Sequence, residues 1–386
     1  MTDTPETPFT SIIRKACSPA ASWMVFNGHQ FADVVVDRDV DVAAGRAGVA
    51  MQDVSPMMKY VIKGKDAGRF LDNLSTRRLS HLAIGRVAYF LMADPLGRVR
   101  DDGTVFRMAD DEFLVQSGTD LSDWMERHRS GFDVRVAAAQ TDWAEMSVFG
   151  PKTAAFLKAA GISGLETLKA FNFMRVNYAG VDLYVSRTGF TGGLGYELLI
   201  PWTKAAAVLQ SLLESPLGGE VVFVGNHTGV TLRLDIGFLI PSWDFPVPRD
   251  GEIVDPARYR TPYDMGWDWL VELDHREDFI GKAALVRIKQ EGPTYCYLAL
   301  VFDDPVDAAA MVGAAIHTLS GERIGEILVC GYSPTVGHSV GLANVRSGRG
   351  QAGDSVTAGD GQARGTLRPQ PLVTFPERVQ VPPPGI

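Results

Sequence analysis

The sequence predicts an α+β fold with more than one domain. Segments typical of strands and helices follow one another in the order β-α-β-β-β-α between residues 59 and 128, which suggests a compact α+β module. A chain of 386 residues is long enough for two or three domains with a large core. From residue 295 onward, short strands separated by turn residues are predicted at 295–302, 308–319, 326–330 and 339–345.

The elements of the N-terminal part follow from proline content, helical spacing and β-type runs. Pro5, Pro8 and Pro19 predict a loose arm over residues 1–20. Residues 66–74 place alanine, phenylalanine and leucine side chains on one helical face. The other predicted elements are strands at 30–36, 59–63, 86–92, 103–108 and 112–116, and helices at 39–49 and 121–128.

A glycine-rich hairpin is predicted where the β-type runs 181–185 and 196–200 flank glycines 189, 192, 193 and 195. Glycine is used where φ is positive or where a ligand approaches the backbone closely. Arg187 and Glu197 lie at the two shoulders of the turn, either as an ion pair or as ligand contacts. The segment matches neither G-x-G-x-x-G nor G-x-x-x-x-G-K-[ST], so a phosphate-binding loop is not indicated.

The composition is that of a soluble globular protein, with 46% hydrophobic and 22% charged residues. The formal net charge of −9 argues against electrostatic binding of nucleic acid or of an anionic membrane. Three widely spaced cysteines without a C-x-x-C pair fit a reducing compartment and no structural zinc site. The histidine spacings indicate no metal site either. Without a secretory signal or an apolar run of roughly twenty residues, we expect a cytoplasmic protein.

Several motifs occur in an order and at a spacing that resemble a known family. The glycine-rich turn, from Ser186 to Glu197, is similar to S-R-T-G-Y-T-G-E-x-G-[FY]-E. Other similar segments lie at 53–55, 63–67, 82–85, 97–102, 150–151, 232–237, 278–285 and 325–337. Over residues 45–345 the series resembles the aminomethyltransferase family, which includes the glycine-cleavage T-protein and related folate-dependent demethylases.

The resemblance implies three domains arranged as a cloverleaf around a central cavity. Residues 1–55 and 140–285 would form a discontinuous folate-binding-type first domain. Residues 56–139 would form an inserted α+β second domain, and residues 286–386 a C-terminal β-barrel.

The resemblance also implies a folate site. Asp102 matches the second aspartate of the family's G-G-x-x-D-D motif, Tyr89 a tyrosine on the preceding strand, and Glu197 the glutamate that hydrogen-bonds the pterin. Because neighbouring strand residues point to opposite faces, we expect only one of Asp101 and Asp102 to face the cavity. A buried Asp102 would have a raised pKa and could handle a proton. Further cofactor-binding positions in the resemblance are Met57, Phe190 and Arg233.

Departures from the family pattern place the chain nearer to the demethylase-like members than to the T-protein. Gly118 stands where relatives have a folate-contacting asparagine, and Gly229 stands where an arginine meets the ligand. Phe190 replaces a tyrosine. Because fixed hydrogen-bond donors are lost, aminomethyl transfer from a lipoyl carrier protein is not expected.

Aromatic residues are clustered in the sequence, and this cluster has two interpretations. They are either core at a domain interface or the lining of an apolar pocket, and the second reading favours an aromatic substrate. His29 and His227 are candidate proton carriers, although isolated histidines are commonly structural or exposed. The candidate substrate-binding residues are Trp243, Phe245, Tyr259, Tyr263 and Trp267.

We therefore expect methyl transfer to tetrahydrofolate from a small methylated substrate, an aromatic methyl ether, largely through positioning. Asp102 would manage the proton or charge, Glu197 would anchor the pterin and Tyr89 would orient the pair. One alternative is a folate-independent lyase that releases formaldehyde from an aromatic substrate. Another is a non-catalytic folate-binding protein. The sequence does not predict the substrate's identity or the oligomeric state.

Overall fold

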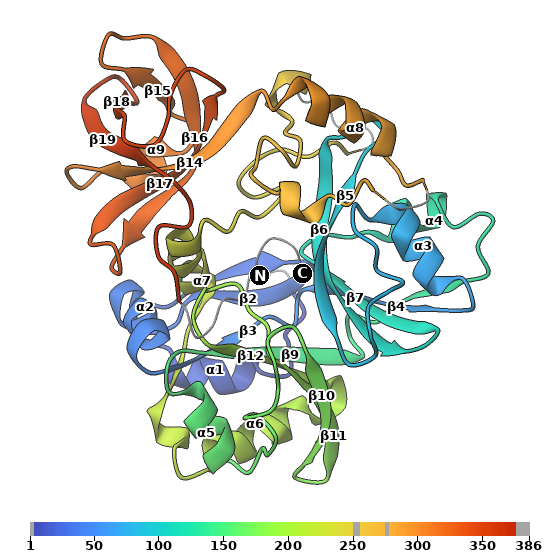
Figure 1. Ribbon diagram of the computed structural model, residues 1–386. Helices are drawn as coiled ribbons and strands as arrows, with labels where there is room; N and C mark the ends of the chain where they lie inside the picture. The colour runs from blue at the N-terminus through green and yellow to red at the C-terminus, as the bar shows by residue number, and fades with distance from the viewer. Residues whose placement is uncertain (1–3, 250–254, 275–277, 376–386) are drawn as a thin grey trace.

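The computed structural model describes residues 4–249, 255–274 and 278–375 (Figure 1). Its strands form a six-stranded sheet, a five-stranded sheet, a closed barrel and a two-stranded hairpin. In Figure 1 the two larger sheets and the barrel surround a common centre. The predicted α+β fold with a C-terminal barrel is therefore confirmed.

The six-stranded sheet carries the glycine-rich hairpin and is antiparallel except for its last pair. Apolar side chains of three helices pack into its core: α1 (Thr10–Ala16), α5 (Thr153–Ala159) and α6 (Ala205–Leu213). A second small core lies between the sheet, α2 (Arg38–Ala47) and α7 (Asn226–Leu232). The strand order is β10 (Phe173–Tyr178), β11 (Val181–Ser186), β12 (Gly195–Pro201), β9 (Trp143–Phe149), β3 (Val49–Asp53) and β13 (Val221–Phe223).

The predicted loose arm over residues 1–20 is wrong in its central part. Residues Thr10–Ala16 form α1, and Phe9, Ile12 and Ile13 are buried in the core of the six-stranded sheet. The three prolines lie outside the helix and do not interrupt it. Burial of this apolar face therefore decides the conformation. The hairpin that follows consists of β1 (Ser22–Phe26) and β2 (His29–Val34).

The five-stranded sheet confirms the predicted pairing of strands 86–92 and 103–108. Its core packs against α3 (Ala67–Leu74) and α4 (Ser122–Arg127). The strand order is β5 (Val87–Ala93), β6 (Val99–Ala109), β7 (Glu112–Ser117), β4 (Met58–Lys63) and β8 (Arg135–Ala138).

The barrel follows α8 (Lys282–Glu291) and closes through the pairing of its first and last strands. The predicted strand at 308–319 is only partly right, because Ala308–Met311 form the short helix α9. The barrel order is β14 (Tyr295–Phe302), β17 (His338–Arg346), β16 (Arg323–Ser333), β15 (Ala315–Thr318), β18 (Ser355–Ala358) and β19 (Ala363–Arg368). Short 3₁₀ helices are η1 (Trp202–Lys204), η2 (Gly218–Glu220), η3 (Arg233–Ile236), η4 (Pro256–Arg258) and η5 (Asp268–Leu270).

After the barrel the chain returns to the centre of the molecule through residues 370–375. The backbone N–H of Val373 donates to the Asp235 carbonyl in η3 over 2.9 Å. The ring of Phe375 lies against the Arg46 guanidinium, with 4.8 Å between the guanidinium carbon and the ring centroid. This segment, called the return segment below, connects the barrel to the other sheets.

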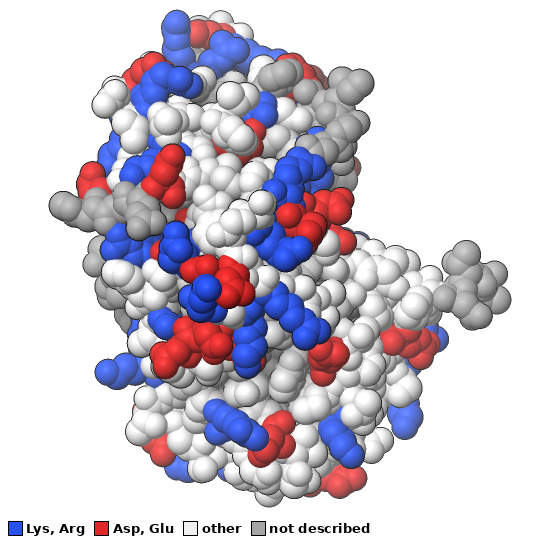
Figure 2. Space-filling view, turned by 90° about the vertical axis from the view of Figure 1, so that its right-hand side faces the viewer, with Lys and Arg blue, Asp and Glu red and all other residues white. Residues whose placement is uncertain are grey.

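The domain limits after residues 55, 139 and 285 stay a prediction. Within the described ranges, no helix has the length and apolar character needed to span a membrane. Figure 2 shows basic and acidic side chains interspersed over one face of the molecule, so this face presents no surface of a single charge.

Candidate active site

A cavity of about 520 Å³ lies where the two larger sheets, the barrel and the return segment meet. Its wall is mostly apolar, with polar groups at a few places, as is typical of small-molecule sites. The aromatic lining consists of Phe26, Phe31, Tyr89, Phe171, Phe190, Phe238, Trp243, Trp267, Trp269, Tyr297 and Phe375. The polar lining consists of Gln52, Asp101, Asp102, Thr104, Gln116, Thr119, Glu145, Thr188, Glu197, Asn226, Gln370 and Thr374.

Asp102 and Tyr89 form a hydrogen-bonded pair in this wall. The Tyr89 hydroxyl donates to Asp102 Oδ2 over 2.6 Å. The residues meet because β5 and β6 pair antiparallel and place them as diagonal neighbours on one face. Burial raises the pKa of Asp102 to about 8, and the neighbouring Asp101 carboxylate contributes to the increase. Burial also raises the pKa of Tyr89 well above its ordinary value, so both groups hold a proton near neutral pH.

Asp101 also lines the cavity, so the expectation that only one of the two aspartates faces it is wrong. The β5–β6 ladder shifts its register beside Met92, the residue opposite Asp101. Such a bulge bends a strand and changes the direction of its side chains. The carboxylate accepts a hydrogen bond from Thr119 and lies 3.3 Å from Arg249 Nη2.

Glu197 is the third residue of β12, which follows the glycine-rich turn. Its carboxyl accepts a hydrogen bond from the Thr188 hydroxyl in the same turn. Burial raises the pKa of Glu197 to about 8, and the nearby Glu145 contributes to the increase. Gly192 has φ +84°, and a Cβ there would lie 2.5 Å from the Ile236 side chain, so the turn requires glycine. The Arg187 guanidinium at the other shoulder donates to a backbone carbonyl over 3.0 Å.

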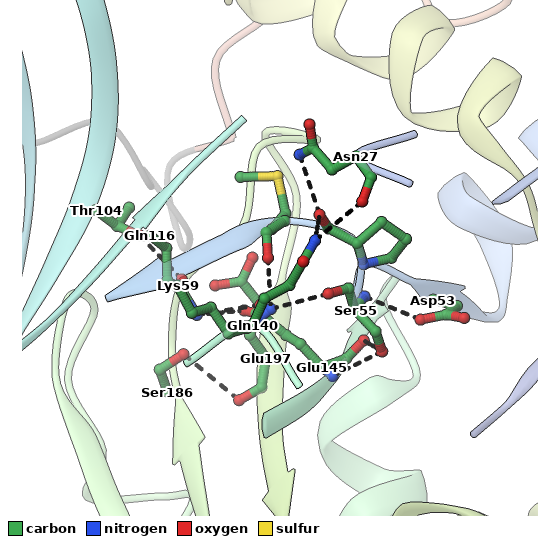
Figure 3. A network of polar contacts seen from close by, with 12 residues as sticks. Asn27, Asp53, Ser55, Lys59, Thr104, Gln116, Gln140, Glu145, Ser186 and Glu197 are labelled. Carbon is green, nitrogen blue, oxygen red and sulfur yellow. Dashed lines mark hydrogen bonds and ion pairs between the residues drawn. The ribbon is translucent and has the colours of Figure 1, made fainter. Parts of the chain in front are cut away.

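A fully buried lysine lies beside these glutamates (Figure 3). Lys59 Nζ is 3.1 Å from Glu145 Oε2 and donates to two backbone carbonyls over 3.2 Å each. Gln116 Nε2 donates to both Glu145 oxygens over 3.1 Å, and its own Oε1 accepts from the Thr104 hydroxyl over 3.0 Å. Glu145 is thus held by several donors, whereas Glu197 accepts from a neutral hydroxyl.

The structure brings seven of the sequence-predicted site residues to one cavity. Asp102, Tyr89 and Glu197 are among its polar lining residues. The others that line it are Met57, Phe190, Trp243 and Trp267.

Six predicted site residues do not line the cavity. Arg233 is buried in an ion pair with Asp244, with 2.7 Å between Nη2 and Oδ1. His29 bonds through its Nδ1 to a backbone carbonyl at 3.2 Å, and His227 lies on α7 with a pKa lowered by burial. The remaining three are Phe245, which packs on Trp267, Tyr259, which stacks on Arg98, and Tyr263, which is half-buried.

Gly118 and Gly229, the two glycines that depart from the family pattern, differ in the space around them. A Cβ on Gly229 would lie 2.8 Å from the Phe190 ring and 3.1 Å from Gln52 Oε1. The aromatic ring therefore occupies the space next to Gly229, and a larger side chain there would displace it. A Cβ on Gly118 would meet nothing within 4 Å, so this position is open.

Sequence reasoning missed Lys59, Glu145 and Gln116. Both charged residues lie in otherwise apolar strands, in Lys-Tyr-Val-Ile and Trp-Ala-Glu-Met-Ser-Val-Phe. A charged residue in a buried strand needs a partner, and this signal could have marked them. Their pairing was not visible, because they are far apart in the sequence and lie on different sheets.

The fold and the cavity define a class of protein: an α+β protein with a C-terminal barrel and a central small-molecule site. The model of the GCVT N-terminal domain matches residues 20–275, and that of the glycine cleavage T-protein C-terminal barrel domain matches residues 296–373. The chain therefore belongs to the aminomethyltransferase family, as the resemblance suggested.

Individual relatives support the same assignment. The aminomethyltransferase of Thermotoga maritima is 30% identical over 317 residues, which cover 79% of this chain and 80% of that one. The probable aminomethyltransferase of Haloarcula marismortui is 31% identical over 346 residues, covering 87% and 90%. The sarcosine oxidase alpha subunit of a Corynebacterium species is 28% identical over 375 residues, covering 87% of this chain and 37% of that one.

A solved structure supports the fold. The glycine cleavage system aminomethyltransferase T of Bartonella henselae superposes with a TM-score of 0.82 at 23% sequence identity, covering 96% of this chain and 98% of that one. At this identity the similarity is evidence for the fold alone.

Proposed function

We propose that the protein transfers a one-carbon unit, a methyl group, to tetrahydrofolate from a small aromatic methyl ether. The relatives named aminomethyltransferase support one-carbon transfer with folate as the general activity. The observation that carries the proposal is the cavity itself. Asp102 with Tyr89 from one sheet and Glu197 from another face the same mostly aromatic space.

The residues present fit a pterin group. Glu197 offers a carboxyl to a pair of N–H donors, which a carboxyl accepts well. Gln52 is 2% exposed and lines the cavity, and its Oε1 has no hydrogen-bond partner among the described residues. A buried unpaired acceptor of this kind favours a ligand that donates to it. Met57 and Phe190 would pack against the rings. When bound, tetrahydrofolate would supply the nucleophilic nitrogen that accepts the methyl group.

The role of Asp102 follows from its protonation. Cleavage of an aromatic methyl ether leaves a phenolate oxygen, which needs a proton or a hydrogen-bond donor. A carboxyl with a pKa of about 8 holds a proton at neutral pH and can donate it. Tyr89 would orient Asp102 through their 2.6 Å hydrogen bond. The aromatic side chains would exclude water and hold the methyl carbon in place.

We favour a methyl donor over an aminomethyl group on a lipoyl carrier protein. The Phe190 ring occupies the space beside Gly229, and Gly118 contributes no side chain. Both positions carry ligand contacts in the family pattern described above. These differences also support the proposal that the activity is of the demethylase-like kind.

The first experiment is a calorimetric titration of the purified protein with tetrahydrofolate. We expect micromolar binding that is at least tenfold weaker in Glu197→Gln, because one carboxyl oxygen becomes an NH2 group that cannot accept a hydrogen bond from the ligand. Glu214→Gln, at an exposed glutamate, is the matched control and should bind as the wild type does. Absence of binding at millimolar tetrahydrofolate would rule out the proposal.

A turnover assay then separates the alternatives. With 2-methoxyphenol and tetrahydrofolate, we expect catechol and methyltetrahydrofolate in equal amounts. Formaldehyde released without folate would instead support the lyase. Folate binding without turnover of any methylated donor would support the non-catalytic alternative.

A further inference from the structure

The charged groups of the cavity are all acidic. Asp101, Asp102, Glu145 and Glu197 line it, and no lysine or arginine occurs among the lining residues in the described part of the chain. An acidic ligand buried here would lose its hydration without gaining a basic partner from this wall.

The basic residues behind the wall are already engaged. Lys59 is bound to Glu145 at 3.1 Å and to two carbonyls. Arg249 lies 3.3 Å from Asp101 and donates to the Ser242 hydroxyl over 2.8 Å. Each base therefore balances a carboxylate of the cavity, and neither lines it.

Among the side chains that the structure describes, only neutral hydroxyls donate to the other two carboxyls: Tyr89 to Asp102 and Thr188 to Glu197. Burial raises the pKa of each to about 8, which agrees with a site that lacks surplus positive charge. A carboxylate ligand would face two groups that ionise near the working pH. Repulsion would raise their pKa values further and weaken binding.

The remaining polar groups of the wall are uncharged. The amide of Gln370 has no hydrogen-bond partner for either its nitrogen or its oxygen among the described residues. Gln52 likewise has an unpaired oxygen. Such amides bind hydroxyl, ether and amide groups without requiring a charge on the ligand.

We propose that the cavity selects uncharged aromatic methyl ethers, such as methoxyphenols, and excludes donors that carry a carboxylate. This selectivity rests on the proposed function, since it names the donor class for the same site. It does not conflict with folate binding, because Trp243 in the wall is 39% exposed and the cavity reaches solvent there. Folate carboxylates can therefore remain hydrated.

The test uses two compounds that differ almost only in charge, 4-hydroxy-3-methoxybenzamide and 4-hydroxy-3-methoxybenzoate. Binding of each to the wild-type protein is measured by calorimetry at pH 7.5, without folate and with saturating tetrahydrofolate. We expect the amide to bind at least about tenfold more tightly, which corresponds to about 1.4 kcal/mol. 2-Methoxyphenol, which carries no such group, should bind in the range of the amide.

A variant then tests whether charge is the cause. Gln370→Arg adds a cation to the wall and should reduce the amide-to-acid affinity ratio to about threefold or less. Gln370→Met removes the same amide without adding charge and should leave the ratio near the wild-type value. Equal affinity of wild type for both compounds would overturn the proposal, as would an unchanged ratio in Gln370→Arg.

The outcomes distinguish this proposal from the proposed function. If the amide binds preferentially but no methyl group reaches tetrahydrofolate, the charge selectivity stands and the methyl transfer fails. If the acid binds as tightly as the amide and both are demethylated, only the selectivity fails. If neither compound binds at millimolar concentration, both proposals are overturned.

Discussion

The cavity has two carboxyl pairs, Asp101–Asp102 and Glu145–Glu197. Their hydrogen-bonding arrangement is the same, but the basic residues that neutralise them differ in burial. In each pair one member is bound to a base and the other accepts from a hydroxyl. The base of the glutamate pair, Lys59, is fully buried. The base of the aspartate pair, Arg249, has a side chain that is 21% exposed.

The hydroxyl partners differ as well. Asp102 accepts from a phenol, which can exchange a proton with a carboxyl more readily than the alcohol of Thr188 can. The glutamate pair is thus held in place by a buried lysine, whereas the aspartate pair, with a phenol on Asp102, is suited to moving a proton. We therefore expect binding at the Glu197 end of the cavity and chemistry at the Asp102 end, and the following predictions test this expectation.

The largest effect is expected for Lys59→Met. The substitution leaves Glu145 buried without its cation, which should lower the free energy of unfolding by about 3–5 kcal/mol. Urea unfolding measures this loss. Lys63→Met on the same strand is the matched control, because that lysine is 55% exposed and its replacement should leave the free energy of unfolding nearly unchanged.

A double variant checks the cause of that loss. Lys59→Met combined with Glu145→Gln removes both charges and should recover most of the stability. A double variant as unstable as Lys59→Met alone would show that packing, and not the counter-charge, matters at this position.

The next effect separates the two ends by kinetics. Asp102→Asn should lower the rate of methyl transfer about 100-fold, equivalent to about 2.7 kcal/mol, because the proton donor is lost. Folate affinity should stay within about threefold of the wild type, whereas Glu197→Gln should mainly weaken that affinity. Steady-state kinetics and calorimetry provide both values. Equal effects of the two substitutions on kcat would contradict a division between a catalytic Asp102 and a folate-binding Glu197.

The third effect is a pH dependence of stability. The pKa of Asp102 is about 8 in the folded protein and about 3.9 in an unfolded chain. Between these values the folded state holds a proton that the unfolded state has released, so the stability from this group declines as pH rises toward 8. Asp102→Asn should therefore gain about 3–4 kcal/mol relative to wild type between pH 5 and pH 8.

Thermal or urea unfolding at several pH values measures this gain. Asp110→Asn is the control, because its side chain is 92% exposed and should show no such trend. A constant difference between Asp102→Asn and wild type across this range would mean that Asp102 is ionised throughout.

The smallest effect on stability is expected for Arg249, the partly exposed base of the aspartate pair. Arg249→Gln should change the free energy of unfolding by less than about 1 kcal/mol, since the pair with Asp101 is partly solvated. Losing the cation should nevertheless raise the pKa of Asp101 and shift the pH profile of transfer upward. The shift should shrink at 1 M salt, where screening is strong. A large loss of stability would place Arg249 in the same category as Lys59.

The fold was predictable because its signals are local or lie in ordered motifs. The alternating strands between residues 59 and 128 and the turn-separated strands after 295 indicated their sheets directly. Asp102, Tyr89 and Glu197 were predicted to share a site through the family resemblance, and they do line one cavity. Their catalytic and binding roles stay a prediction.

The remaining features depend on distant contacts that a sequence pattern does not show. Asp101 lines the cavity beside a bulge at Met92. This bulge depends on how β5 and β6 pair. The buried Lys59–Glu145 pair joins two different sheets. Arg233 had the residue type of a ligand contact, yet Asp244, in the loop that follows η3, binds it instead. The residue types show which side chains can carry a charge or bind a ligand. Tertiary packing decides which of these side chains meet.

The return segment has a consequence for biosynthesis. It follows the last barrel strand, and through Gln370 and Phe375 it forms part of the cavity wall. Both carboxyl pairs have therefore left the ribosome well before this wall exists. A nascent chain that stops short of the segment lacks this part of the aromatic wall. A ligand of the cavity would stabilise only chains that include the segment, so its binding would mark the completion of folding.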